Sequence, residues 1–229
     1  GLAPFDASRA GVFCGRDEEL DALHDALQEL RAGTAPRMLL LAGGSGSGKT
    51  SLAQAGLLPT LHAAGDWRVR TLRPTGDVSA RLGAAIGEAP TDGTPLLVLV
   101  DPFESVFDLP PSARQRLVRA LWRQASTPGG SVSVLLCLRI EYLGRCSELV
   151  VDDAGTRLDA VAFLESHQII LRDPSPRALR SMLMEPAARA GLELDPALAH
   201  KLANAVTGLQ PPLPHLAAAT ARMWVARTG

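Results

Sequence analysis

The sequence predicts an α/β fold, in which a five-stranded parallel sheet lies between two layers of helices and a small helical domain follows. Up to about residue 173, short apolar runs alternate with helix-type patterns, as in parallel sheets. Residues 96–100 are apolar at every position, which is typical of a central strand buried on both faces. Beyond residue 173 only helix-type patterns occur. We therefore predict two domains, residues 1–173 and 174–229.

The first predicted helix follows an irregular N-terminal stretch. Asp17 can cap this helix, and its acidic first turn complements the helix dipole. Four leucines recur on one face, namely Leu20, Leu23, Leu27 and Leu30. The pair Gly15-Arg16 that precedes the helix is, on pattern alone, most simply interpreted as a turn.

The remaining strands and helices of the first domain are likewise predicted from apolar patterns, capping residues and prolines. The predicted strands are residues 38–42, 67–72, 96–100, 132–138 and 168–171. The predicted helices are residues 49–64, with a kink or break at Pro59, residues 78–86 capped by Asp77, and residues 111–125. The arginines on the outer face of the last helix are interpreted as a solvated face. One or two short helices are expected around Asp152-Asp153 within residues 143–165.

Three helices are predicted for the second domain. Two begin at a polar cap followed by a first-turn proline, Ser175-Pro176 and Asp195-Pro196. The third follows Pro211-Pro212. The apolar residues expected on their inner faces are Leu179, Met182 and Leu183, then Leu198, Leu202 and Val206, then Leu216, Met223 and Trp224.

The composition is that of a globular protein and shows no general signal for binding nucleic acid or membranes. The 229 residues are 46% apolar and 21% charged, which is ordinary for a globular chain, and the net charge of −1 provides no general attraction to nucleic acid or membranes. Apolar runs of about half a dozen residues fall well short of the ~18 that span a bilayer. We expect a soluble, cytoplasmic protein with no membrane partner, without nucleic acid as a partner, and excised from a longer chain.

The three cysteines, Cys14, Cys137 and Cys146, are odd in number and lack a C-x-x-C spacing. This excludes a zinc site or a disulfide framework as the basis of the fold. We expect all three to be small buried residues.

Residues 43–50 read Gly-Gly-Ser-Gly-Ser-Gly-Lys-Thr and lie between a predicted strand and a predicted helix. Such a glycine-rich turn directs successive backbone N–H groups inward, where they bind phosphate. Lys49 would reach the β- and γ-phosphates of a nucleotide, and the Thr50 hydroxyl would bind Mg²⁺. The alternative is a flexible loop that happens to hold a lysine. The candidate residues of this P-loop are Gly43, Gly44, Ser45, Gly46, Ser47, Gly48, Lys49, Thr50 and Ser51.

Charged residues follow two other predicted strands. Asp101 would hold Mg²⁺, usually through a water. Glu104 would either orient the attacking water of a hydrolysis reaction or pair with an arginine, and the residues leave both interpretations open. Arg139 ends a buried strand and needs an anionic partner, with the γ-phosphate favoured over a carboxylate such as Glu141 or Asp101. The predicted catalytic residues are Lys49, Asp101, Glu104 and Arg139.

Taken together, these motifs resemble the STAND class of P-loop NTPases, and within it the bacterial novel STAND NTPases of type one. The resemblance covers nearly the whole chain. The matching stretches are Phe13-Cys14-Gly15-Arg16-Asp17-Glu18-Glu19-Leu20, residues 44–52, Ala55-Gly56-Leu57-Leu58-Pro59, Asp101-Pro102-Phe103-Glu104, Leu138-Arg139-Ile140-Glu141-Tyr142, Glu185-Pro186-Ala187 with Gly191-Leu192, and Leu213-Pro214-His215-Leu216 before Trp224.

The resemblance implies a P-loop NTPase three-layer sandwich in which the Arg139 strand lies between the strands that precede Lys49 and Asp101, followed by a helical lid. It implies that Arg139 senses the γ-phosphate and that Pro214 contacts the nucleotide from the lid. It further implies an adenine pocket lined by Val12, Phe13, Gly15 and Arg16. ATP or ADP with Mg²⁺ is expected, since a guanine-reading Asn/Thr-Lys-x-Asp motif is absent.

Relatives in this class act as ATP-dependent switches in bacterial signalling and defence, usually fused to an effector and to repeat sensors, which implies such partners here and nucleotide-dependent homo-oligomers. Where the family usually shows Asp-Gln-Phe-Glu-Glu, this chain has Asp101-Pro102-Phe103-Glu104-Ser105, so one acidic group is missing. We therefore expect a switch with slow ATP hydrolysis. The alternatives are an AAA-like remodelling motor and a scaffold that has lost nucleotide binding.

Overall fold

The computed structural model describes residues 4–33, 36–87, 93–162 and 164–227. The chain divides into two compact units, which are described separately. The sheet unit contains Ala22–Gly43 and Thr60–Ile170, and the loop unit contains Gly1–Asp21, Gly44–Pro59 and Leu171–Gly229. The predicted domain boundary at residue 173 stays a prediction.

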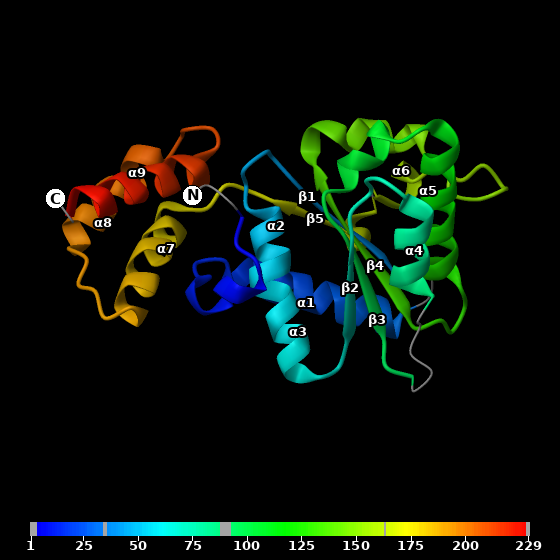
Figure 1. Ribbon diagram of the computed structural model, residues 1–229, viewed down its shortest axis with the longest axis horizontal. Helices are drawn as coiled ribbons and strands as arrows, with labels where there is room; N and C mark the ends of the chain where they lie inside the picture. Colours follow the sequence, from blue (N-terminus) through cyan, green and yellow to red (C-terminus); the bar gives the residue numbers. More distant parts are fainter. Residues whose placement is uncertain (1–3, 34–35, 88–92, 163, 228–229) are drawn as a thin grey trace. The chain divides into compact units, whose positions relative to one another are not determined.

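The sheet is five-stranded and parallel, with the order β2-β3-β4-β1-β5 (Figure 1). Leu39 of β1 is in register with Leu135 of β4, and Leu97 of β3 with Ser133 of β4. The α/β fold class is thus confirmed, and so is the position of β4, which ends at Arg139, between β1 and β3. The strands are β1 Met38–Gly43, β2 Arg68–Leu72, β3 Leu96–Val100, β4 Val132–Arg139 and β5 Gln168–Leu171.

Both faces of the central strands are buried, as their uniformly apolar sequences predict. One face forms a core with Val78 of α4 and with Leu117, Val118 and Leu121 of α5, and these two helices lie beside one another (Figure 1). The helical elements that lie wholly or partly in this unit are α1 Asp17–Ala32, α3 Leu58–Ala64, α4 Val78–Ile86, η3 Phe103–Asp108, α5 Pro111–Ser126, η4 Ile140–Glu148, α6 Asp159–Ala162 and η5 Glu165–His167, where η3, η4 and η5 are 3₁₀ helices.

Two local predictions for this part of the chain need correction. The cap of α1 was wrong, and the short helices expected within residues 143–165 are present as the end of η4 and as α6 but do not include Asp152-Asp153. Asp17 is the first residue of α1 rather than its cap, and the Arg16 carbonyl accepts the first helical bond, from the Leu20 N–H at 2.9 Å. Asp152 lies in a turn between η4 and α6, where its carboxylate accepts the Thr156 N–H at 2.9 Å. Short acidic side chains bind nearby backbone donors in this way, which favours a turn over a helix. The α5 residue Arg119 pairs with Asp153 in the same turn.

The loop unit begins with a 3₁₀ helix, η1, and contains the helix that follows the P-loop. That helix starts as α2, continues as the π-helical stretch η2, and becomes α3 immediately before Pro59, which has no N–H to donate. The irregularity expected at Pro59 is therefore a change of helical pattern just ahead of the proline. The elements of this unit are η1 Ala7–Val12, α2 Lys49–Ser51, η2 Leu52–Leu57, α7 Pro176–Arg189, α8 Pro196–Val206 and α9 Pro212–Arg227.

The three C-terminal helices, α7 to α9, share a small core and are called the lid. Ser175 and Asp195 cap α7 and α8 as predicted, accepting the N–H groups of Ala178 at 3.1 Å and Ala197 at 2.8 Å. The core comprises Leu179, Leu183, Ala199, Ala203, Val206 and Leu216. Of the residues predicted for the inner face of α8, Val206 is in this core and Leu202 packs against it, whereas Leu198 is only half-buried. The alanines of the core, which were not predicted, let α8 approach α7. The Trp224 side chain lies outside the described part of the structure.

The three cysteines are all buried, as predicted. Within the described residues, no helix has the length and apolar character needed to cross a membrane.

Candidate functional site

The P-loop connects β1 to α2. Gly46 and Gly48 adopt left-handed backbone conformations, with φ of 73° and 96°. Lys49 is only 9% exposed, and its Nζ donates to the Gly44 carbonyl at 2.8 Å. The turn therefore folds back so that the lysine ammonium lies on its own loop.

Ser47 is the most buried polar residue of this loop. It is 2% exposed, and its Oγ has no hydrogen-bond partner within the described residues. A buried hydroxyl of this kind is costly unless something binds it. Together with the Lys49 ammonium, it makes the loop chemically suited to an anionic, oxygen-rich group such as a polyphosphate.

Arg16 is buried beside the P-loop, with only 3% of its surface exposed. Its Nη2 donates to the Ser47 carbonyl at 2.9 Å, and its Nη1 donates to the Arg172 carbonyl at 3.0 Å and pairs with the Glu19 carboxylate. Gly15 makes the predicted turn, with φ of 75°. A Cβ at Gly15 would lie 2.7 Å from the Ala178 carbonyl oxygen, so this turn lies directly against the lid helix α7.

Val12 and Phe13 have different surroundings. Val12 is 38% exposed at the end of η1. Phe13 packs against Gly56 of η2, where an added Cβ would lie 2.9 Å from the phenyl ring. On the other side of the loop, the Ser51 hydroxyl accepts the Phe5 N–H at 3.0 Å. The adenine pocket implied by the resemblance stays a prediction.

The beginning of α9 lies on the P-loop. A Cβ at Gly46 would lie 2.8 Å from Pro211 and 3.0 Å from Pro214, and a Cβ at Gly48 would lie 3.0 Å from Leu213. Pro214 is thus beside the loop, together with two residues that sequence reasoning did not single out. Pro211 had been assigned only to the start of a helix, because local patterns do not reveal which distant glycine a proline will touch.

Asp101, Glu104 and Arg139 belong to the sheet unit. Asp101, 3% exposed, directly follows β3, and its peptide bond to Pro102 is cis. Arg139 Nε lies 2.9 Å from Glu104 Oε1, and the Arg139 N–H donates to Glu104 Oε2 at 3.3 Å. The carboxylate partner of Arg139 is therefore neither Glu141 nor Asp101.

The Arg139 side chain is 50% exposed, whereas that of Glu104 is 12% exposed. The expectation that Arg139 is buried was wrong. It was based on the buried run that precedes it, but this residue is the last of β4 and its side chain reaches solvent.

The predicted magnesium ligands lie in different units, Thr50 in the loop unit and Asp101 in the sheet unit. Within the described ranges there is no group of three or more His, Cys, Asp or Glu side chains that could hold a metal alone. Mg²⁺ needs no such group, because it is commonly held by one or two protein oxygens together with substrate phosphates and waters. The Thr50 hydroxyl and the Asp101 carboxylate have the chemistry for this role.

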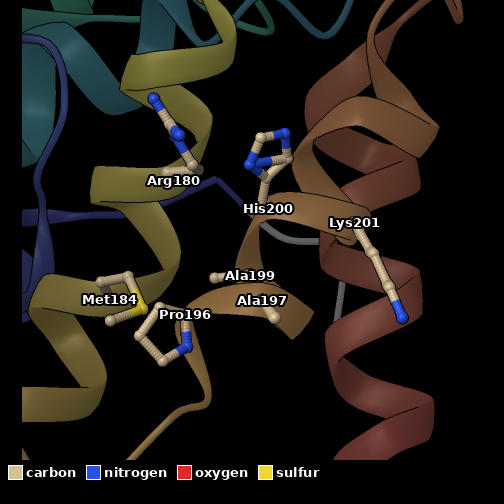
Figure 2. Close-up of a pocket in the computed structure, with 7 residues that line it drawn as sticks. All are labelled: Arg180, Met184, Pro196, Ala197, Ala199, His200 and Lys201. Carbon is tan, nitrogen blue, oxygen red and sulfur yellow. The ribbon is translucent and has the colours of Figure 1, made fainter.

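A hollow of about 550 Å³ lies between α7 and α8 (Figure 2). Arg180 and His200 extend over it, whereas the Lys201 ammonium points away. None of its lining residues is among the predicted site residues. They are Arg180, Met184, Pro196, Ala197, Ala199, His200 and Lys201.

Comparison with known proteins supplies a family and a fold. A family model described as Novel STAND NTPase 1 matches residues 1–229. No match to a curated protein sequence was found.

Among solved structures, a chain of the S. cerevisiae Hsp104:casein complex in its extended conformation is similar with a TM-score of 0.68 and 18% identity, over 97% of this chain and 41% of that chain. Domain III of the Thermotoga maritima replication initiation protein DnaA has a TM-score of 0.61 and 17% identity, over 99% and 91%. A chain of the E. coli MS115-1 HORMA:CdnC:Trip13 complex has a TM-score of 0.58 and 17% identity, over 86% and 75%. At these identities the likeness concerns the fold.

Proposed function

Because the chain belongs to the Novel STAND NTPase 1 family, we propose that it is an ATP-binding switch module of bacterial signalling or defence. Membership of this family implies nucleotide binding with a divalent metal. The observation that carries the proposal is the seating of α9 on the P-loop, at Gly46 and Gly48. A nucleotide bound by this loop must contact or displace Pro211, Leu213 and Pro214, so the lid responds to its presence.

The protein residues divide the work of binding. The P-loop amides and the Lys49 ammonium bind the β- and γ-phosphates, and Pro214 contacts the nucleotide from the lid. Thr50 and Asp101 would hold Mg²⁺, and the ion would neutralise phosphate charge. Arg139 exchanges its Glu104 partner for the γ-phosphate, which makes the site sensitive to ATP as opposed to ADP.

Charged contacts to the phosphates can supply the free energy that such a switch requires. Moving a switch from 1:99 to 99:1 takes about 5.5 kcal/mol of state-dependent affinity. A hydrogen bond to a charged group contributes about 1.5 to 3 kcal/mol, so roughly two or three such contacts are sufficient. Lys49 and Arg139 are the residues that would supply them.

Slow hydrolysis is part of the proposal. Glu104, the candidate for orienting water, is the partner of Arg139, and Ser105 stands where relatives have a second acidic residue. We expect turnover of about 10⁻⁴ to 10⁻² per second, as in unassisted P-loop switches.

The test is calorimetric titration of the protein with Mg·ATP. Lys49→Ala should weaken binding by roughly a hundredfold, about 2.7 kcal/mol, because the phosphates lose their charged partner. The chain offers a matched control, since Lys201 is its only other lysine, is exposed, and points away from the hollow between α7 and α8 (Figure 2). Lys201→Ala should bind as the unaltered protein does.

Three results would contradict the proposal. Unchanged affinity in Lys49→Ala would remove the P-loop role, and no binding by the unaltered protein would favour the scaffold. Turnover well above the expected range, with subunits that assemble into a ring in light scattering, would favour the AAA-like motor.

A further inference from the structure

Arg16 connects three segments that are far apart in the sequence. Its acceptors are the Ser47 carbonyl, 31 residues away, the Arg172 carbonyl, 156 residues away, and the nearby Glu19 carboxylate. Resting on the proposed function, we propose that Arg16 is a positioning residue, which orients the Ser47–Gly48 peptide for phosphate binding and ties it to the segment where the lid begins. This role differs from lining an adenine pocket.

The burial of Arg16 indicates a strong structural requirement. A guanidinium cannot lose its charge in a protein, so a 3% exposed arginine needs acceptors to offset its lost hydration. Arg16 finds them in one carboxylate and two backbone carbonyls. The planar guanidinium suits this task because its terminal nitrogens donate in fixed, diverging directions, which a lysine ammonium does not reproduce.

The contact with Ser47 sets the direction of the next N–H group. In a trans peptide the carbonyl of one residue and the N–H of the following residue point to opposite sides. Because Arg16 binds the Ser47 carbonyl on one side, the Gly48 N–H points to the other. The Gly48 N–H immediately precedes Lys49, in the part of the loop whose amides bind phosphate.

The contact with Arg172 reaches the beginning of the lid. Arg172 directly follows β5, and the cap of α7, Ser175, comes three residues later. Neighbours of Arg16 also contact α7: Gly15 lies against Ala178, and the Gly11 carbonyl accepts from Arg189 at 2.6 Å. A shift of the Ser47 peptide is thereby transmitted to the segment that carries α7.

The adenine role and the positioning role predict different selectivity. A residue that reads the base should change the preference for ATP over GTP when it is altered. A residue that positions a phosphate-binding peptide should weaken ATP, GTP and base-free tripolyphosphate by the same factor. Both terminal nitrogens of Arg16 already donate to protein oxygens, which favours the second outcome.

The experiment measures the affinities of Mg·ATP, Mg·GTP and tripolyphosphate for the unaltered protein and for Arg16→Gln. We expect a roughly tenfold loss for all three ligands, with the ATP to GTP ratio preserved. Arg16→Lys should recover part of the loss, because it restores the charge without the planar geometry. Arg9→Gln is the matched control, since Arg9 is an exposed arginine of the same segment, and it should change nothing.

A second readout addresses the lid. At saturating Mg·ATP, hydrogen exchange within α7 should change in the unaltered protein, and this change should fall to less than half in Arg16→Gln. Glu18→Gln guards against a general folding defect, because Glu18 is an exposed carboxylate in the same first turn of α1, and this variant should bind tripolyphosphate within about twofold of the unaltered protein.

The outcomes separate the inference from the proposed function. If the unaltered protein binds neither ATP nor tripolyphosphate, the proposed function fails. If it binds both and Arg16→Gln binds them equally well, or loses only the preference for ATP over GTP, the positioning role is wrong. An equal loss in Glu18→Gln would assign the effect to the start of α1 and would also overturn the inference.

Discussion

Arg16 in the loop unit and Arg139 in the sheet unit are both predicted to meet the nucleotide, yet their surroundings differ in kind. Arg16 is almost completely buried and donates to two backbone carbonyls and a carboxylate. The Arg139 side chain is half exposed, and the carboxylate that it contacts is that of Glu104. Removing a buried arginine disturbs every segment that it joins, whereas a half-exposed arginine can change partners at little cost.

The difference in burial between Arg16 and Arg139 indicates two different roles for an arginine at a phosphate-binding site. Arg16 acts through the backbone and holds the loop in shape before any ligand arrives. Arg139 is suited to contacting the ligand itself, because its side chain is half exposed and the Glu104 carboxylate keeps the Arg139 main-chain N–H as a donor when the guanidinium leaves. The following predictions test this division, beginning with the largest expected effect.

Arg16→Ala should lower the free energy of unfolding by about 3 kcal/mol, because it leaves the Ser47 and Arg172 carbonyls without their buried donor. Urea denaturation followed by circular dichroism measures this change. A loss below about 1 kcal/mol would place Arg16 in the same class as Arg139 and remove the contrast.

Gly46→Ala should cost about 2 kcal/mol in the same assay. The residue has φ of 73°, and its new methyl group would lie 2.8 Å from Pro211. Gly65→Ala is the matched control, because Gly65 also has a left-handed φ, of 71°, but a Cβ there meets nothing within 4 Å. Equal stability of the two variants would show that α9 does not rest on the loop in solution.

Arg139→Ala should change the free energy of unfolding by less than about 1 kcal/mol, because the Arg139 side chain is half exposed and the main-chain N–H of residue 139 still binds Glu104. Its effect should instead appear in competition titrations, as a roughly tenfold loss of preference for ATP over ADP. A stability loss as large as that of Arg16→Ala would show that Arg139 is a structural residue.

The smallest predicted effect on stability comes from the thiols of Cys14, in the loop unit, and Cys146, in the sheet unit. Burial, and next a hydrogen bond to Glu185, raise the pKa of the Cys14 thiol to about 11, and burial raises the pKa of Cys146 to about 12. Since the fold favours the neutral thiols, their contribution to stability should be complete below pH 9 and be lost as the pH rises through 11 to 12.

Between pH 7 and 8, neither thiol should react with a disulfide reagent unless the protein unfolds. Rapid labelling of Cys14 alone, measured by mass spectrometry, would show that the segment leading to Arg16 opens in solution. Arg16 would then be less constrained than its burial indicates.

Local chemistry was enough to predict most of the fold. Uniformly apolar runs identified the central strands, and Asp77, Ser175 and Asp195 cap helices because their side chains accept N–H groups two or three residues away. The prediction for α8 missed Ala199 and Ala203, because small alanines indicate a buried face less clearly than the leucines beside them.

The sequence was sufficient to identify the P-loop, but it did not identify most of the contacts that Arg16 and Arg139 make. The P-loop motif is contiguous, so the sequence reveals it directly. Two of the three acceptors of Arg16 are backbone carbonyls, which every residue possesses, and no side-chain pattern identifies these two. The pairing of Glu104 with an arginine was one of the two interpretations that the sequence left open, but Arg139 was not identified as its partner. The two residues lie 35 positions apart, whereas Glu141 and Asp101 seemed nearer to Arg139 in sequence or role.

Glu104 is held by two donors of one residue, the guanidinium and the main-chain N–H of Arg139. The main-chain donor is independent of the side chain, so it persists in any variant at position 139 other than proline. When the guanidinium turns towards a ligand, the main-chain hydrogen bond still holds the Glu104 carboxylate at the end of β4. Glu104 can therefore keep one orientation whether the Arg139 guanidinium contacts Glu104 or the ligand. Returning to the unliganded arrangement then requires only a rotation of the Arg139 side chain.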